Sequence, residues 1–234
     1  MTVLDTTISS NRFRPVVFDL YRGVHKGIRS ELFAVVGEAG RVDPSDDCGL
    51  AALEAQVREV AQFLEQHAAT EDHHIGPVLE EQVPFLAEQV ASDHEALDAR
   101  VERLCALASG VCNATGPRNE AMHEMYIELA SFTGSYLQHQ DLEERVINPT
   151  LEDTIGVDEM VRIHQSIIAG MQPQELMKGL AMMLPAMNID DRTGLLGGIK
   201  ASAPEPAWAA VWSLAGSVLT PDDHQAVGRR LGLG

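Results

Sequence analysis

The stretch FLEQHAATEDHH, residues 63–74, contains His67 and, four residues later, Glu71. The same spacing recurs in YLQHQDLEERV with His139 and Glu143. On an α-helix, residues four apart differ by about 40° in heading and about 6 Å along the axis, so each pair offers an imidazole and a carboxylate to one point beside its helix. Two such pairs on facing helices suit a centre of two metal ions.

The composition around these pairs favours a helical protein. The chain has 234 residues, of which 45% are hydrophobic, so it can bury a sizeable core. Aromatic residues make up only 5%, whereas Ala, Leu, Glu and Gln are common and β-branched runs are short. We therefore expect an all-α fold.

The charge of the chain limits its partners. A formal net charge of −18 and a pI near 4.7 would repel phosphate backbones and anionic lipid surfaces. We therefore expect no nucleic acid and no membrane as a partner. Most of the excess carboxylates should form a solvated surface, which would also attract cations.

The cysteines and the N-terminus suggest where the protein works. Its three cysteines, Cys48, Cys105 and Cys112, form no CxxC motif, so neither a disulfide framework nor a thiolate zinc site is predicted. The N-terminus has no basic segment followed by an apolar one, and no apolar run approaches the length of a membrane span. We expect a soluble, cytoplasmic protein.

Four long segments have apolar residues at helical spacing. We expect helices at residues 13–37, 49–82, 84–110 and 118–148. Gly76-Pro77 should kink the second helix or end it early, and Asn148-Pro149 should end the fourth, because proline lacks an amide hydrogen and clashes with the preceding turn.

These segments predict the domain organisation. After a polar lead at residues 1–12, residues 13–150 should form an up-down-up-down four-helix bundle, the default for four long helices joined by loops. Residues 151–234 change character, with shorter helical pieces separated by Gly and Pro. We expect them to form a helical C-terminal extension.

The histidines are distributed over the bundle in a regular way. His25, His67, His94 and His139 fall one on each of the four long segments, away from the predicted helix ends. A single such histidine is more often a surface or core residue than a ligand. Four of them, with two carboxylates at i+4, match the imidazole and carboxylate ligands that suit pairs of iron or manganese ions in bundle cores.

The order His, HxxxE, His, HxxxE resembles the hemerythrin-like, or HHE cation-binding, domain over residues 13–150. The strings HAATEDHHIGPVLEE and HQDLEERVINPTLE are also similar to that family's local patterns. The resemblance implies a non-heme centre of two iron ions, bridged by carboxylates and by an oxo or hydroxo group, with manganese and zinc as alternatives. The implied ligands are His25, His67, Glu71, His94, His139 and Glu143.

One departure from the oxygen-carrying hemerythrins concerns the third helix. Those proteins have five histidines, two of them four apart on that helix, whereas Asp98 follows His94 at this spacing here. Four histidines and two bridging carboxylates would leave open positions on the metals. The departure argues against reversible oxygen carriage.

Several further side chains could approach the metals. His74, at i+7 from His67, differs from it by only about 20° in heading and is a candidate additional ligand. Tyr21 and Tyr136 could reach the metals or simply pack beside them. Asp72, one residue after Glu71, is turned about 100° away and should be a surface or supporting acid.

The extension offers apolar surface but no catalytic motif. Trp208 and Trp212 share one helix face, which we expect to dock on the bundle or on a second copy of the chain, giving a homo-oligomer. The methionine-rich stretch MKGLAMMLPAMN should fill core space, although methionines also serve adaptable partner binding.

The functional hypothesis is a di-iron protein that binds or reacts with dioxygen, hydrogen peroxide or nitric oxide. A peroxide-decomposing or other oxidoreductase activity would fit, but no separate acid or base is identifiable, so the question of an enzyme stays open. The alternative is an iron- or oxygen-responsive sensor whose extension contacts a partner. A third reading is a metal-free bundle with structural histidines.

Overall fold

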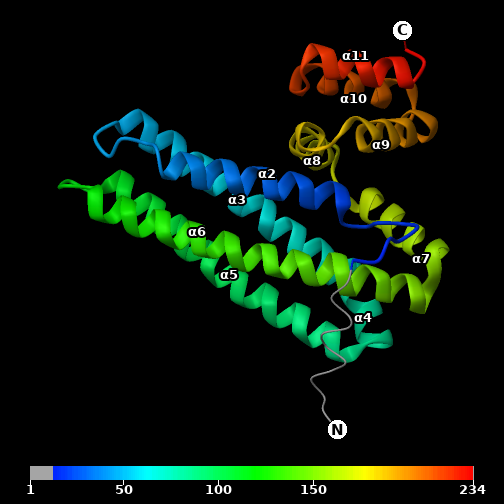
Figure 1. Ribbon diagram of the computed structural model, residues 1–234, viewed down its shortest axis with the longest axis horizontal. Helices are drawn as coiled ribbons and strands as arrows, with labels where there is room; N and C mark the ends of the chain where they lie inside the picture. The colour runs from blue at the N-terminus through cyan, green and yellow to red at the C-terminus, as the bar shows by residue number, and fades with distance from the viewer. Residues whose placement is uncertain (1–12, 234) are drawn as a thin grey trace. The chain divides into compact units, whose positions relative to one another are not determined.

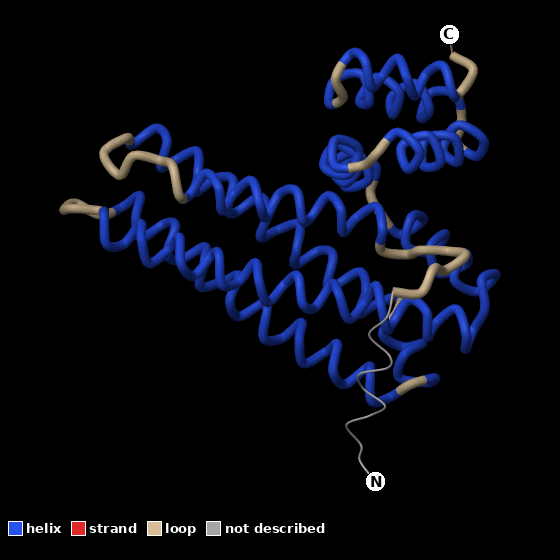
Figure 2. The backbone as a smooth tube through the Cα atoms, viewed as in Figure 1, coloured by secondary structure: helices blue, strands red, loops and turns tan. Residues whose placement is uncertain are grey.

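The computed structural model describes residues 13–233, and every regular element in this range is helical, as predicted (Figure 2). The predicted polar lead at residues 1–12 lies outside the described residues. None of the described helices is long and apolar enough to cross a membrane. The helices are α2 (Arg22–Ala39), α3 (Asp47–His74), α4 (Gly76–Gln82), α5 (Pro84–Asn113), α6 (Asn119–Leu142), the π-helix η1 (Glu143–Ile147), α7 (Asn148–Gly170), α8 (Pro173–Ala186), α9 (Ile189–Ser202), α10 (Glu205–Val218) and α11 (Pro221–Arg230).

The chain divides into two compact units. The first contains residues 13–21 and Glu31–Ile167, and the second contains Arg22–Ser30 and residues 168–233. Helix α2 therefore contributes residues to both units. A boundary at residue 150 stays a prediction about the folding units of the chain.

The first unit is built from long helices that lie side by side. Helix α3 packs on α5, and α5 packs on α6 (Figure 1). The buried side chains of α3 include Leu53, Val57, Val60, Leu64 and Ala68, which recur every three or four residues and form one apolar stripe. Burial of such stripes holds the helices together, at about 1.5–3 kcal/mol for each large side chain.

The predicted break at Gly76-Pro77 is confirmed. Helix α3 ends at His74, where the Ile75 amide donates to the carbonyl of Glu71 at 2.7 Å. Pro77 then occupies the first turn of α4, where its missing amide hydrogen leaves no bond unmade. The last turns of α3 thus come directly before a fixed change of direction.

The prediction that Pro149 ends the fourth helix is wrong, since the chain stays helical from α6 through η1 into α7. In η1 the backbone widens, and the Asn148 amide donates to the carbonyl of Glu143, five residues earlier. This wider turn accommodates a proline ring that a regular α-helix would not. Further along, α7 kinks at Gly156, whose φ is 76°, a value that favours glycine.

The second unit has its own hydrophobic core. Met187 and Met183 lie against Gly23 within this unit, so the methionine-rich stretch fills core space as predicted. Trp208 belongs to the core, and Trp212 stacks on His224 with ring centroids 4.1 Å apart. The face expected to dock elsewhere is therefore covered within the unit. The buried members of the core are Leu180, Leu184, Leu196, Trp208, Val211, Ala215, Leu219 and Val227.

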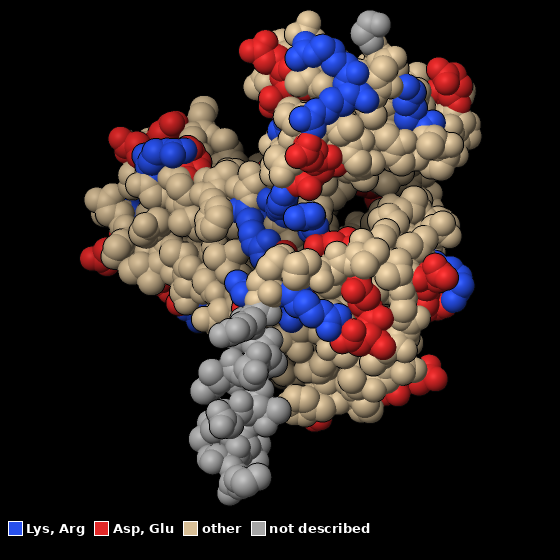
Figure 3. Space-filling model, turned by 45° about the vertical axis from the view of Figure 1, so that its right-hand side comes forward, with Lys and Arg blue, Asp and Glu red and all other residues tan. Residues whose placement is uncertain are grey.

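The surface carries charges of both signs. On the face drawn in Figure 3, clusters of carboxylates are interspersed with clusters of Lys and Arg side chains. This mixture fits a solvated surface for the charged residues of this face.

Candidate metal centre

The two HxxxE pairs lie at corresponding places on their helices. His67 and Glu71 continue the buried stripe of α3 over its last two turns. His139 lies in the last turn of α6, and Glu143 is the first residue of η1. His94 comes from α5, between these two helices. All five side chains are buried, with exposed fractions of 9% or less.

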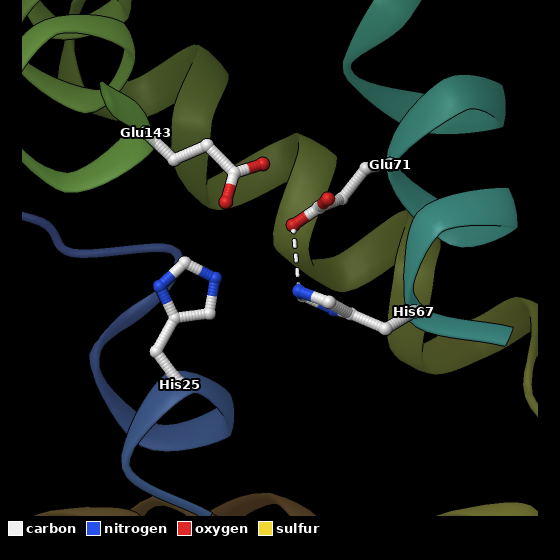
Figure 4. Close-up of side chains that lie close together, drawn as sticks. All are labelled: His25, His67, Glu71 and Glu143. Atoms are coloured by element: carbon white, nitrogen blue, oxygen red, sulfur yellow. Dashed lines mark ion pairs between the residues drawn. The ribbon is translucent and has the colours of Figure 1, made fainter. Parts of the chain in front are cut away.

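Two groups of side chains could each hold a metal ion. One contains Glu71, His94, His139 and Glu143, and the other contains His25, His67, Glu71 and Glu143 (Figure 4). Within each group, one potential ligand atom from every residue lies within 4.8 Å of the others. The structure thus brings all six predicted residues together, and Glu71 and Glu143 belong to both groups.

The pairs have the geometry that their spacing predicts. His67 Nε2 lies 3.2 Å from Glu71 Oε1, the ion pair drawn in Figure 4. His139 Nε2 lies 3.3 Å from Glu143 Oε1. His94 Nε2 is 3.1 Å from His139 Nε2. Two nitrogens that each lie about 2.1 Å from one ion, at right angles, would be separated by about 3.0 Å, so the spacing of these imidazoles fits a shared ion.

The outer nitrogens of two of these imidazoles face carboxylates. His94 Nδ1 lies 2.8 Å from Asp72 Oδ1, within hydrogen-bond distance, whereas His139 Nδ1 lies 3.6 Å from Asp93 Oδ2, an ion-pair distance without a hydrogen bond. A carboxylate at the far nitrogen fixes the orientation and the tautomer of a metal-binding histidine. Asp72, expected to be a surface or supporting acid, is largely exposed and contacts His94, and its supporting role stays a prediction. Asp93 was missed, although it immediately precedes His94 in the sequence.

The two carboxylates shared by the groups repel each other. Burial raises the pKa of Glu71 well above its usual range, and the charge of Glu143 raises it further. Glu71 Oε2 is buried and has no hydrogen-bond partner among the described residues. A cation between the carboxylates would remove the repulsion and partner this oxygen. The site therefore fits a metal ion.

Residues 16–151 match the hemerythrin HHE cation-binding domain, which covers more than half of the chain. The chain belongs to this family. No curated protein and no solved structure matches it. The resemblance read from the sequence is thereby confirmed, and the clustered histidines and glutamates lie inside the matched region of this hemerythrin-family chain.

Two tyrosines flank the carboxylates of the hemerythrin domain. Tyr136 packs edge-on against His139 with ring centroids 5.9 Å apart. Burial raises the pKa values of Tyr21 and Tyr136 well above the ordinary value, and the charges of Glu71 and Glu143 raise both further. Both phenols therefore stay protonated at neutral pH and can serve as hydrogen-bond donors.

The candidate additional ligand, His74, belongs to neither group. Its Nδ1 lies 3.4 Å from the hydroxyl of Ser166 on α7, and its ring packs edge-on against His73. Burial, followed by the charge of His73, lowers the pKa of His74. His74 therefore lies at the contact between α3 and α7 in this hemerythrin domain.

A cavity of about 580 Å³ reaches the metal groups from the surface of the first unit. Its inner lining includes Glu71, His94 and Glu143, together with the buried ring of Tyr21. Ligands of the size of dioxygen or peroxide fit a cavity of this volume. The cavity therefore brings open space next to three of the candidate ligands of this hemerythrin-family protein.

Proposed function

We propose that this chain is a non-heme di-iron protein that binds or reacts with a small oxidant or gas, namely dioxygen, hydrogen peroxide or nitric oxide. The observation that carries the proposal is the pair of overlapping ligand groups that share Glu71 and Glu143. Two adjacent metal positions with two common carboxylates are the arrangement that a dinuclear centre needs. The family match and the buried, mutually repelling carboxylates support it.

Each ligand would have a defined task in this centre. Glu71 and Glu143 would bridge the two ions, one held by His25 and His67 and the other by His94 and His139. A mixed imidazole and carboxylate set favours iron or manganese over softer metals, and iron when bound supplies the redox chemistry. We propose that the helices of the domain run up-down-up-down, as in the predicted bundle.

Reaction with the ligand, rather than reversible oxygen carriage, is proposed because of the third helix. Asp98 occupies the position four residues after His94, where oxygen carriers have a further histidine. In this structure Asp98 belongs to neither ligand group and lines the cavity instead. One metal position is therefore left open toward the cavity for the small molecule.

Anaerobic reconstitution with ferrous iron tests the proposal. We expect two iron ions per chain and ultraviolet-visible spectra that change when dioxygen, peroxide and nitric oxide are added in turn. His139→Ala should lower the iron content, whereas His123→Ala, at a histidine outside both groups, should leave it unchanged. Purified protein that binds no stoichiometric iron after reconstitution would disprove the proposal.

The second candidate function is a sensor whose C-terminal helices contact a partner. It is favoured by the separate hydrophobic core of the second unit, which gives these helices a fold of their own. Hydrogen exchange distinguishes the two functions. Iron-dependent protection of residues 168–233 supports a sensor, and unchanged exchange in these residues counts against it.

A further inference from the structure

Seven of the sixteen residues that line the cavity beside the metal groups are acids. Beyond Glu71 and Glu143, its wall carries Asp72 at the end of α3 and Glu80 on α4. Helix α5 supplies three more carboxylates. Among the lining residues, His94 is the only one that can carry a positive charge.

The carboxylates of α5 form a line. Glu95, Asp98 and Glu102 are spaced by three and then four residues, so they lie on one face of the helix and span about 10 Å along its axis. Ala91 and Ala99 lie on the same wall and are too small to fill the cavity. The line therefore runs along an open passage.

The acids of the passage are close enough to influence one another. Burial raises the pKa of Asp98, and the charges of Asp72 and Glu102 raise it further, against the lowering effect of His94. Asp98 thus senses an acid on α3, an acid on its own helix and a histidine of the metal group. Asp98 lines the same cavity as these three residues.

The inner end of the passage is a site prepared for a cation. Glu71 is 6% exposed, lines the cavity, and has in Oε2 a buried oxygen without a hydrogen-bond partner among the described residues. A row of carboxylates that leads to such an oxygen lowers the electrostatic potential along the whole passage. Clefts lined by one sign of charge raise association rates of opposite charges by about 10- to 1,000-fold.

We propose that this cavity is the uptake path for hydrated divalent cations, and that Asp98 and Asp72, which both line it, form a transient capture position outside the metal groups. The inference rests on the proposed metal centre. It adds a loading function to residues that are not ligands of the final site. Asp72 also orients His94, so its substitution would mix two effects, and the test uses the α5 carboxylates alone.

The experiment measures how fast the metal-free protein takes up cobalt(II) under anaerobic conditions, by stopped-flow absorption. The test variant combines Glu95→Gln, Asp98→Asn and Glu102→Gln. We expect its uptake rate to fall about tenfold or more at low salt, with an unchanged final cobalt content. The difference should shrink at 0.5 M salt, where the screening length is about 4 Å.

A matched control removes three charges from another helix face. Glu120, Glu124 and Glu128 on α6 lie outside the cavity lining, and their replacement by Gln changes the net charge by the same amount. The inference is overturned if the control slows uptake as much as the test variant, or if the test variant loads at the wild-type rate. A lower final cobalt content in the test variant would also overturn it, because Asp98 would then be a ligand. If the wild-type chain binds no metal, the proposed function fails as well.

Discussion

Arg192 of the second unit and Glu71 of the first are equally buried, each 6% exposed, yet their surroundings differ. The Arg192 guanidinium donates to the carbonyls of Leu184 and Pro185 at 2.7 and 3.0 Å and to Asp223 at 2.8 Å. Glu71 has one oxygen without a hydrogen-bond partner in the part of the chain that the structure describes, and the charge of Glu143 acts on it. The protein compensates Arg192 with hydrogen bonds, whereas Glu71 has two imidazoles nearby, His67 Nε2 at 3.2 Å and His94 Nε2 at 3.5 Å, and is still repelled by Glu143.

This difference separates a structural ion pair from a binding site. A buried charge that the chain itself compensates holds neighbouring elements in place and needs no ligand. A buried carboxylate with an open oxygen destabilises the metal-free fold, and its cost is recovered only when a cation binds. The buried amide of Gln140, next to His139 in the chain, also has no hydrogen-bond partner among the described residues, and the same holds for His139 Nδ1 and, in the second unit, for His224 Nε2.

The largest expected effect comes from Glu71→Gln. Because Glu71 belongs to both ligand groups, we expect the affinity for both ions to fall by more than about 100-fold, beyond the loss typical of groups that only support a ligand. The metal-free variant should be more stable than the wild type, because the amide removes the repulsion with Glu143. Metal analysis by mass spectrometry and urea unfolding of the metal-free protein measure the two effects.

Glu65→Gln provides the control for this change. Glu65 lies on the same helix but is exposed, so its substitution should alter neither metal content nor stability by a measurable amount. If the Glu71→Gln protein keeps two ions per chain, Glu71 is not a ligand shared by both ions. A less stable metal-free variant would show that Glu71 is compensated after all.

Arg192→Met should lower the stability and leave metal binding unchanged, the opposite of what we expect for Glu71→Gln. The substitution leaves two carbonyls and Asp223 without their donor, which we expect to cost about 2–4 kcal/mol of unfolding free energy. The only two tryptophans, Trp208 and Trp212, both lie in the second unit, so tryptophan fluorescence during urea unfolding reports this loss. Metal affinity should stay unchanged.

Arg229→Met is the matched control, because Arg229 is exposed on α11. It should change the free energy of unfolding, measured by the same fluorescence experiment, by less than about 0.5 kcal/mol. Equal effects of the two substitutions would mean that the buried hydrogen bonds of Arg192 contribute nothing to stability.

The sequence predicts the parts of the molecule that depend on local periodicity. The HxxxE pairs point inward because i and i+4 share a helix face, and α3 ends before Pro77 because proline forces a break there. Both features follow from residues within one or two helical turns. They needed no knowledge of how the helices pack.

The sequence does not predict features that depend on packing between helices. Asp93 Oδ2 lies 3.6 Å from His139 Nδ1 only because α5 and α6 lie side by side. No spacing of residues within α5 predicts this contact. Pro149 remains within helical structure because a π-helix precedes it, and the residue pattern does not predict that π-helix. The grouping of Arg22–Ser30 with the C-terminal helices is likewise a property of the folded chain.

Asp93→Asn tests a carboxylate that lies near the candidate ligand His139 without belonging to either metal group. The amide keeps the size of the side chain but removes the negative charge near His139 Nδ1. We therefore expect metal affinity to fall about 10- to 100-fold, with both ions still bound at saturation. Competition with a chromophoric chelator measures the affinity. The exposed Glu88→Gln, one turn earlier on α5, serves as the control and should bind as the wild type does. An unchanged affinity in Asp93→Asn would reduce the contact to a chance proximity.

The smallest effect is expected at His164, a partly buried histidine of the first unit that belongs to neither metal group. Its ring packs edge-on against Phe18 at 5.7 Å, and burial lowers its pKa below the ordinary 6.5. Because the folded state favours the neutral ring, the stability it contributes is present above about pH 6.5 and is lost as the pH falls through the folded pKa.

We therefore expect metal-free His164→Gln to lose less stability than the wild type between pH 7 and pH 5. One titrating group can contribute a slope of at most about 1.4 kcal/mol per pH unit. Urea unfolding followed by circular dichroism measures the slopes, with His123→Gln as the exposed control on α6. Parallel pH profiles for wild type and His164→Gln would mean that burial of this ring carries no charge penalty. If His164→Gln has a smaller slope than the wild type and His123→Gln does not, this buried histidine outside the metal groups avoids the cost of a buried charge by staying neutral. Arg192 stays charged and offsets that cost through its hydrogen bonds instead.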